Sequence, residues 1–127
     1  MYKKFATAIN CVDGRVQLPV IAWVKEKYQV DYVDMITEPG PDKLLSENKQ
    51  NSQIELVKKK VEISLKKHGS KLIVLAGHHD CAGNPVDEKR HREEILNGVK
   101  VIKSWNLDAK VLGVWVNSKW IVSRIAS

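Results

Sequence analysis

Apolar residues recur along this chain in two alternating patterns, stripes at helical spacing and short continuous runs. Three segments carry an apolar residue at every third or fourth position, which is typical of an amphipathic helix packed on one side. These segments are residues 18–28, 54–65 and 95–105. Asn51 or Ser52 can cap the second helix and Asp87 the third, while Gly69 ends the second.

The continuous apolar runs between these stripes predict strands. They cover residues 3–10, 31–37, 71–77, 109–116 and, after a turn at Asn117-Ser118, 119–125. The segment KLIVLAG at 71–77 is apolar almost throughout, as expected of a strand covered on both faces in a parallel sheet. The segment EPGPDK at 38–43 contains two prolines and a glycine and predicts a loop.

The order of strands and helices predicts an α/β fold. We expect a single domain, residues 1–127, with a mainly parallel central β-sheet of four to five strands flanked by α-helices, and an edge strand after a C-terminal hairpin. A chain of 127 residues can bury one core but is too short for two ordinary domains. Functional residues of such folds gather where parallel strands end. Cys11 follows the first strand and the segment His78 to Cys81 follows the third, so we expect both loops to open into one crevice.

Charge and composition narrow the range of partners. The net charge is +6, and lysines and arginines gather at 58–60, 66–67 and 89–92, on helices where a solvated face explains them. No aromatic residues are interleaved with these lysines, so we expect no nucleic-acid partner. No apolar run reaches the roughly 18 residues that span a bilayer, and no secretory leader is evident, so we expect a soluble, cytoplasmic protein without a membrane partner.

Three residues share the chemistry of a zinc ligand set, namely Cys11, His78 and Cys81. Two thiolates and an imidazole suit tetrahedral zinc, and the short spacing from His78 to Cys81 lets one turn present both. Taken singly, each has an ordinary explanation as a buried thiol or a solvated imidazole, and the two cysteines could also form a disulfide. Together, at the ends of two strands, they favour metal binding with an open fourth position. The side chains that remain for that position are His79, Asp13 and Asp80.

Two segments, Cys11-Val12-Asp13-Gly14-Arg15 and Gly77-His78-His79-Asp80-Cys81-Ala82-Gly83, resemble the beta-class carbonic anhydrases, whose hallmark is C-x-D-x-R followed by H-x-x-C. The resemblance implies that Cys11, His78 and Cys81 bind zinc and that Asp13 and Arg15 form a dyad controlling the metal's fourth position. It also implies a zinc lyase that hydrates carbon dioxide reversibly to bicarbonate and a proton through zinc-bound hydroxide. A homo-oligomer, dimer or higher, is implied as well.

The dyad has a chemical rationale, because two thiolates cancel the charge of zinc and leave its water less acidic than three histidines would. Asp13 could orient the nucleophile while Arg15 keeps Asp13 ionised, or Asp13 could bind zinc directly. Taken by itself, the pair is better explained as a simple surface ion pair at a turn. His79 is the nearby side chain whose ordinary pKa suits proton transfer to solvent, so we assign it that catalytic role.

The chain departs from the family after the second predicted strand. Where the family has an Arg-Asn-Ala-Gly-like loop lining the substrate site, this chain has Thr37-Glu38-Pro39-Gly40-Pro41-Asp42. Two alternatives to carbon dioxide hydration therefore stay open. One is a related hydrolase of carbonyl sulfide or carbon disulfide, and the other is a non-catalytic zinc-binding regulatory protein.

Overall fold

Five strands form one sheet in the order β2-β1-β3-β4-β5 in the computed structural model, which describes residues 3–49 and 51–127. Along the chain the elements are β1 (Phe5–Asn10), α1 (Gly14–Tyr28), β2 (Tyr32–Thr37), α2 (Pro41–Glu47), α3 (Ser52–His68), β3 (Leu72–His78), α4 (Glu88–Ser104), β4 (Lys110–Val116) and β5 (Val122–Ala126). The strands β2, β1, β3 and β4 are parallel, and β5 runs antiparallel to β4. The predicted α/β class, with its hairpin and edge strand, is confirmed.

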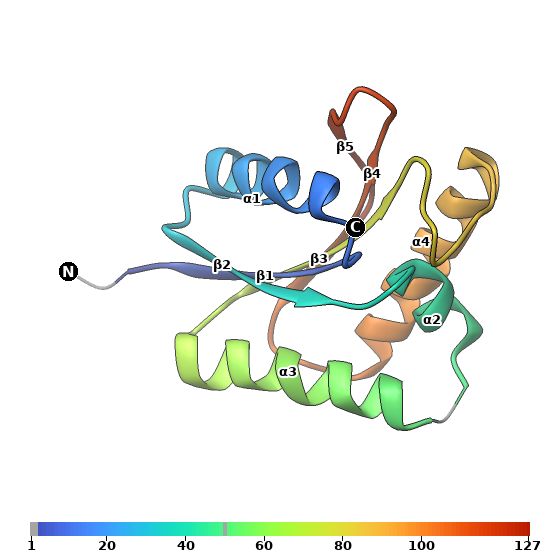
Figure 1. Cartoon of the computed structure of the whole chain (residues 1–127). Helices are drawn as coiled ribbons and strands as arrows, with labels where there is room; N and C mark the ends of the chain where they lie inside the picture. The colour runs from blue at the N-terminus through green and yellow to red at the C-terminus, as the bar shows by residue number, and fades with distance from the viewer. Residues whose placement is uncertain (1–2, 50) are drawn as a thin grey trace.

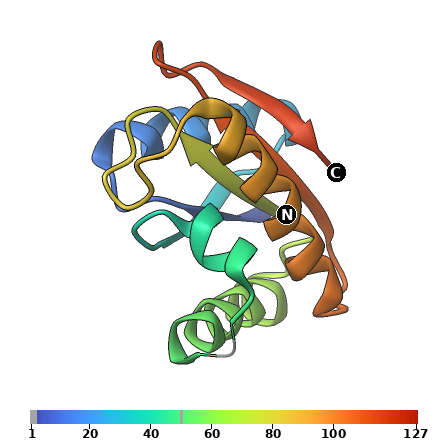
Figure 2. The same cartoon turned by 90° about the vertical axis from the view of Figure 1, so that its right-hand side faces the viewer.

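The helices cover the sheet from both sides (Figure 1). Helix α1 packs Val16, Val20 and Val24 against one face, together with alternate residues of β1, β3 and β4. Helices α2, α3 and α4 pack against the other face. Figure 2 shows β5 at the outer edge of the sheet, with the C-terminus at its end. Within the described residues, no helix is long and apolar enough to cross a membrane.

Strand β3 explains the continuous apolar run that predicted it. Because side chains alternate across a strand, Leu72, Val74 and Ala76 enter the core beneath α1, whereas Ile73 and Leu75 enter the core on the opposite face. Every residue of this strand is buried. The run is therefore apolar because both faces are covered.

Helix α1 begins four residues before the predicted start at residue 18. Asp13 is its N-cap, and a side-chain oxygen of Asp13 accepts a hydrogen bond from the backbone N–H of Arg15. Pro19, which would fall in the first turn of a helix beginning at residue 18, therefore lies inside the helix. The last strand also begins later than predicted, at Val122, because Asn117 holds a turn by accepting backbone hydrogen bonds from Lys119 and Ile121.

The predicted loop over residues 38–43 is wrong from Pro41 onward, where α2 begins. Proline suits the first position of a helix because its φ is fixed and its missing N–H is not needed there. Gly40 precedes it with φ of +54°, and a Cβ at Gly40 would lie 2.8 Å from the carbonyl of Gly83. The segment before α2 thus packs directly on the loop that follows β3.

Candidate metal centre

Three ligand-bearing side chains meet where β1 and β3 end. The ligand atoms of Cys11, His78 and Cys81 all lie within 4.8 Å of one another, and all three residues are buried. β1 and β3 are parallel neighbours, so their carboxyl ends lie at the same edge of the sheet, at the point where the strand order reverses. The structure therefore brings together the three residues that the sequence singled out.

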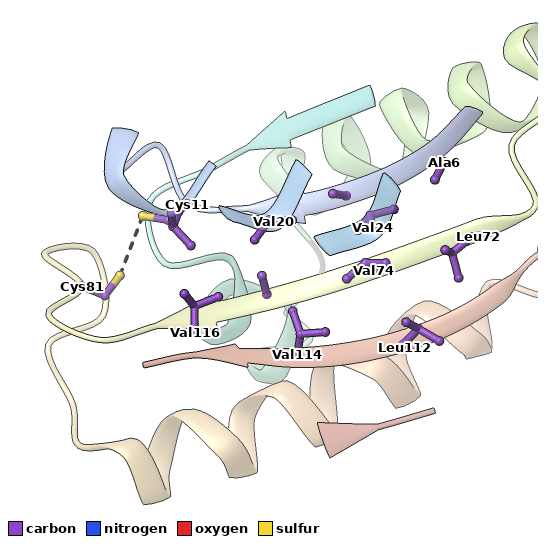
Figure 3. Close-up of a cluster of buried hydrophobic side chains, with 13 residues drawn as sticks. Ala6, Cys11, Val20, Val24, Leu72, Val74, Cys81, Leu112, Val114 and Val116 are labelled. Carbon is purple, nitrogen blue, oxygen red and sulfur yellow. Dashed lines mark hydrogen bonds between the residues drawn. The ribbon is translucent and has the colours of Figure 1, made fainter. Parts of the chain in front are cut away.

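The two cysteines are free thiols that approach each other across this edge. Their sulfur atoms are 3.8 Å apart, and Figure 3 shows both side chains at the end of the core beneath α1. Burial raises the pKa of the Cys81 thiol to about 11, and the neighbouring Cys11 adds to this increase. Two thiolates at this distance repel each other in a dry environment. A bound cation offsets that repulsion, so the pair suits a divalent metal.

His78 presents one ring nitrogen with no protein partner. Its Nδ1 donates a hydrogen bond to the carbonyl oxygen of His79 at 2.7 Å, which leaves Nε2 as the unprotonated atom. This Nε2 is buried and finds no hydrogen-bond partner among residues 3–49 and 51–127. Burial also lowers the pKa of His78, which favours the neutral ring that a metal requires. An unpaired buried acceptor beside two thiols fits a metal ligand.

Asp13 and Arg15 lie beside these ligands and form the bidentate pair that the motif suggested. Arg15 Nη2 and Nε donate to the two carboxylate oxygens of Asp13 at 2.7 Å and 3.1 Å. The Arg15 side chain lowers the pKa of Asp13 to about 2, so this carboxylate is ionised at neutral pH. Together with the backbone N–H of Arg15, three donors fix its orientation.

Arg15 also joins three loops around the ligands. Its guanidinium donates to a carboxylate oxygen of Asp80 at 3.3 Å and to the Asp80 carbonyl at 3.1 Å, and lies 4.8 Å from the ring centre of Trp120. Asp80 belongs to the loop after β3, and Trp120 to the turn between β4 and β5. The ring of Trp120 is in turn 6.0 Å from that of His78. Arg15 therefore connects the start of α1 to both neighbouring loops.

His79 and Asp80 are exposed and line a cavity of about 530 Å³ beside the ligands. The cavity extends from Cys81 past the segment that precedes α4 to the end of β4, where Trp115 lies. The backbone N–H of His79 donates to the carbonyl of Val116 at 2.9 Å, which anchors the residue while its ring stays accessible to solvent. This cavity offers room for a small substrate next to the metal loop.

A buried polar cluster behind the metal loop was not anticipated from the sequence. It consists of Asp42 on α2, Asn84 after the metal loop, and His91 and Glu94 on α4, and each of these residues is at most 3% exposed. His91 Nδ1 lies 2.6 Å from an Asp42 carboxylate oxygen, and Asn84 Nδ2 donates to Asp42 at 3.2 Å and to Glu94 at 3.1 Å. Asn84 is three residues beyond Cys81, so the cluster anchors the metal loop to two helices.

One residue that contacts the cluster did carry a signal in the sequence. Gly77 belongs to the motif that singled out the metal loop, and a Cβ at this position would lie 2.7 Å from an Asp42 carboxylate oxygen. The polar partners themselves carried no such signal, because a histidine and a glutamate on a helix are ordinary surface residues until the fold covers them.

Comparison with known proteins points to the same family as the sequence motifs. The family model described as "Putative carbonic anhydrase" matches residues 1–126, whereas no curated protein matches the chain. Among solved structures, the chain is similar to a beta-carbonic anhydrase from Trichomonas vaginalis at 14% identity, with a TM-score of 0.63, covering 100% of this chain and 87% of that one.

Two fungal structures are similar in the same way. A beta-carbonic anhydrase from Aspergillus fumigatus is 10% identical, with a TM-score of 0.65 and coverage of 98% of this chain and 76% of that one. A chain from the crystal structures of two tetrameric beta-carbonic anhydrases from Sordaria macrospora is 15% identical, with a TM-score of 0.63 and coverage of 100% of this chain and 83% of that one. At these identities the structures establish a shared fold. Because the family model spans nearly the whole sequence, the chain belongs to this carbonic anhydrase family and has the beta-class fold.

Proposed function

We propose that this protein is a zinc enzyme that hydrates carbon dioxide reversibly to bicarbonate and a proton. The observation that carries the proposal is the convergence of Cys11, His78 and Cys81, with the buried His78 Nε2 left without a protein partner. Membership of the carbonic anhydrase family supports the choice of reaction. Two thiolates and one imidazole are a ligand set that suits zinc and leaves a fourth tetrahedral position for water.

Zinc with three protein ligands supplies a Lewis acid that lowers the pKa of coordinated water toward neutrality. The side chains of the protein hold the metal and orient the reacting groups. Cys11, His78 and Cys81 provide the ligand atoms, and the Nδ1 hydrogen bond of His78 fixes its ring for ligation through Nε2. Asp13 is ionised and held by three donors from Arg15. In this role it accepts a hydrogen bond from the O–H group that attacks carbon dioxide, and so orients the lone pair of that oxygen toward the carbon of the substrate.

The position of Asp13 favours this orienting role over direct binding to the metal. Direct ligation would require Asp13 to give up hydrogen bonds from Arg15 and its place as the N-cap of α1. Loss of an N-cap alone costs about 1 kcal/mol. Arg15 is itself restrained by Asp80 and Trp120, so the dyad is organised before substrate arrives.

His79 is assigned to proton transfer between the metal centre and solvent. Its ring is exposed and it follows the ligand His78 directly, while Cys81 lines the same cavity. The His79→Ala variant should lose turnover in dilute buffer and regain it in concentrated imidazole buffer, since a free base can replace a shuttle. A loss that imidazole does not restore would contradict the assignment.

A second candidate substrate is carbonyl sulfide or carbon disulfide, which the same residues could hydrolyse. The observation that favours it is the segment after β2, because Thr37 to Asp42 contains no arginine that could hold the bicarbonate anion, while Glu38 pairs with Lys60 and Asp42 is buried. Linear, uncharged substrates need no such cation.

We also propose that the chain forms a homo-oligomer in the cytoplasm, by analogy with the structures described as tetrameric. Sedimentation velocity tests the assembly.

The decisive experiment measures zinc content together with stopped-flow hydration of carbon dioxide. Wild-type protein should contain about one zinc per chain and accelerate hydration. Cys11→Ser should lose zinc and activity, whereas Asp13→Ala should keep zinc and lose roughly 10- to 100-fold in activity. Asp108→Ala is the matched control, because this exposed carboxylate pairs only with Lys71 among the described residues.

The outcomes separate the candidate functions. Zinc without hydration, but with hydrolysis of carbonyl sulfide or carbon disulfide, would replace the first substrate with the second. Stoichiometric zinc with neither activity would identify a non-catalytic zinc protein. Protein purified without zinc, and unable to take it up, would refute the metal centre itself.

A further inference from the structure

A second cavity lies far from the metal centre, where the parallel strands begin. It has a volume of about 730 Å³ and is formed by the starts of β1, β3 and β4 and the ends of α1 and α3. Figure 1 shows the ends of α1 and α3 near the start of β1, at the end of the molecule away from the carboxyl ends of the strands. The volume lies within the range of roughly 300–1,000 Å³ that small-molecule sites occupy.

Six lysines line this cavity and no acidic residue does: Lys3, Lys4, Lys66, Lys67, Lys71 and Lys110. Only two of them have a carboxylate partner in the described parts of the chain, Lys66 with Glu62 and Lys71 with Asp108. The carboxyl ends of α1 and α3 contribute about half a negative charge each, roughly −1 in total, against the other four ammonium groups. The excess positive charge calls for an anionic ligand.

The floor of the cavity is aromatic. The rings of Phe5 and His68 are stacked with centres 4.3 Å apart, Tyr28 lies in the same lining, and Lys110 is 5.8 Å from the centre of the Tyr28 ring. The sequence showed no aromatic residues among its lysine clusters, because Phe5 and Tyr28 are distant from Lys66 and Lys67 along the chain. The fold brings the two kinds of residue together.

The stacked pair is held in place from the core. His68 Nδ1 lies 2.7 Å from an Asp34 carboxylate oxygen, and the same oxygen accepts a hydrogen bond from the hydroxyl of Ser64 at 2.7 Å. Ser64 Oγ lies 2.6 Å from Thr7 Oγ1, which lies 2.8 Å from Ser70 Oγ, and these three hydroxyl residues are at most 2% exposed. A buried chain of hydrogen bonds therefore fixes the orientation of an exposed ring, as in a preorganised site.

We propose that this cavity binds a nucleotide, with the base on the Phe5, His68 and Tyr28 rings and the phosphates on the lysine rim. Flat apolar rings combined with several ammonium groups match a ligand that carries a planar base and a polyphosphate at its two ends. The cavity is bounded by five elements, which favours a single nucleotide over a nucleic-acid strand. This site is separate from the metal centre and does not depend on its activity.

Isothermal titration with ATP, tripolyphosphate and adenosine tests the proposal on the full chain. ATP should bind saturably at one site per chain, more tightly than either tripolyphosphate or adenosine, and more weakly at higher salt. Lys67→Glu should weaken ATP about tenfold, because it reverses one charge at the rim. Lys59→Glu is the matched control, since this exposed lysine lies on the same helix outside the cavity, and it should change ATP affinity less than about twofold.

The aromatic floor is tested by Phe5→Leu, with Tyr28→Leu as a second variant if the first unfolds. Either should weaken ATP about fivefold and leave tripolyphosphate binding unchanged. Several results would overturn the proposal. These are no saturable binding of ATP, tripolyphosphate binding as tightly as ATP, and equal losses from Lys59→Glu and Lys67→Glu. Binding of a single-stranded RNA oligonucleotide much tighter than ATP would also overturn it, in favour of a nucleic-acid surface.

Discussion

Asp42→Ala removes an acceptor that three donors share behind the metal loop. These donors are His91 Nδ1, Asn84 Nδ2 and the backbone N–H of Lys43, at 2.6, 3.2 and 3.0 Å. His91 and Asn84 are each 1% exposed, so water cannot replace the lost carboxylate without entering the core. A buried donor left unpaired costs about 1–3 kcal/mol. Two such donors, with Asn84 retaining Glu94, give a loss of roughly 2–5 kcal/mol in the free energy of unfolding.

Such a loss is large against the total stability of about 5–15 kcal/mol that is usual for a domain. Urea unfolding followed by far-ultraviolet circular dichroism, at one fixed free zinc concentration, measures it. With an m-value of about 1.5 kcal/mol per molar urea, a loss of about 3 kcal/mol lowers the unfolding midpoint by roughly 2 M. Zinc affinity should fall as well, because Asn84 anchors the loop that carries Cys81.

Two control variants separate the effect of losing the buried hydrogen-bond acceptor from the effect of losing a negative charge. Asp42→Asn keeps an oxygen acceptor of nearly the same shape and should lose less stability than Asp42→Ala. Asp108→Ala deletes a carboxylate that is 98% exposed and paired with Lys71, and should change stability by less than about 1 kcal/mol. If Asp42→Ala lost no more stability than Asp108→Ala, the buried cluster would not be what holds the metal loop.

Three other perturbations test the packing, the helix capping and the metal. Gly113→Ala should lose roughly 1–3 kcal/mol in chemical denaturation, because its Cβ would lie 2.5 Å from a side-chain carbon of Ile95, whereas Gly14→Ala, with no atom within 4 Å, should lose none. Asn51→Ala should lose about 1 kcal/mol by the same measurement, since its side chain accepts from the backbone N–H of Ile54 at 2.9 Å, and Asn51→Ser should retain most of the stability. Chelating the metal should lower the melting temperature by roughly 10 °C and abolish hydration, and zinc but not magnesium should restore both; an unchanged melting temperature would contradict this.

The strands and the candidate metal ligands could be recognised in the sequence because their signals are local. The apolar run of β3 indicates burial on both faces, and parallel topology places Cys11 and His78 at the same edge once their strands are neighbours. The N-caps Asn51 and Asp87 and the C-cap Gly69 also follow from short-range chemistry. The apolar run, the caps and the two ligand motifs each depend on residues close together along the chain, whereas the meeting of Cys11 with His78 follows from the strand topology.

The remaining features depend on contacts between distant segments, which no local pattern encodes. Helix α2 does not stand out in the sequence because prolines and a glycine also mark loops, and the close packing of Gly40 on Gly83 is a contact between distant segments. His91 meets Asp42 across 49 residues, and its position on α4 looks like an ordinary surface position until that contact forms. The aromatic floor beside Lys66 and Lys67 likewise exists only in the folded protein.

The segment after β2 connects these observations to the question of substrate. Its residues make contacts within the protein. Glu38 pairs with Lys60 at 4.0 Å, Gly40 packs on the metal loop, and the buried Asp42 accepts a hydrogen bond from Asn84. None of the three is free to recognise a charged group near the metal. If this segment now holds the metal loop in place, substrate selection falls to the metal centre, Asp13 and Arg15. A small linear molecule that reacts at its carbon needs no more than these groups, which is why the proposed substrates are restricted to that class.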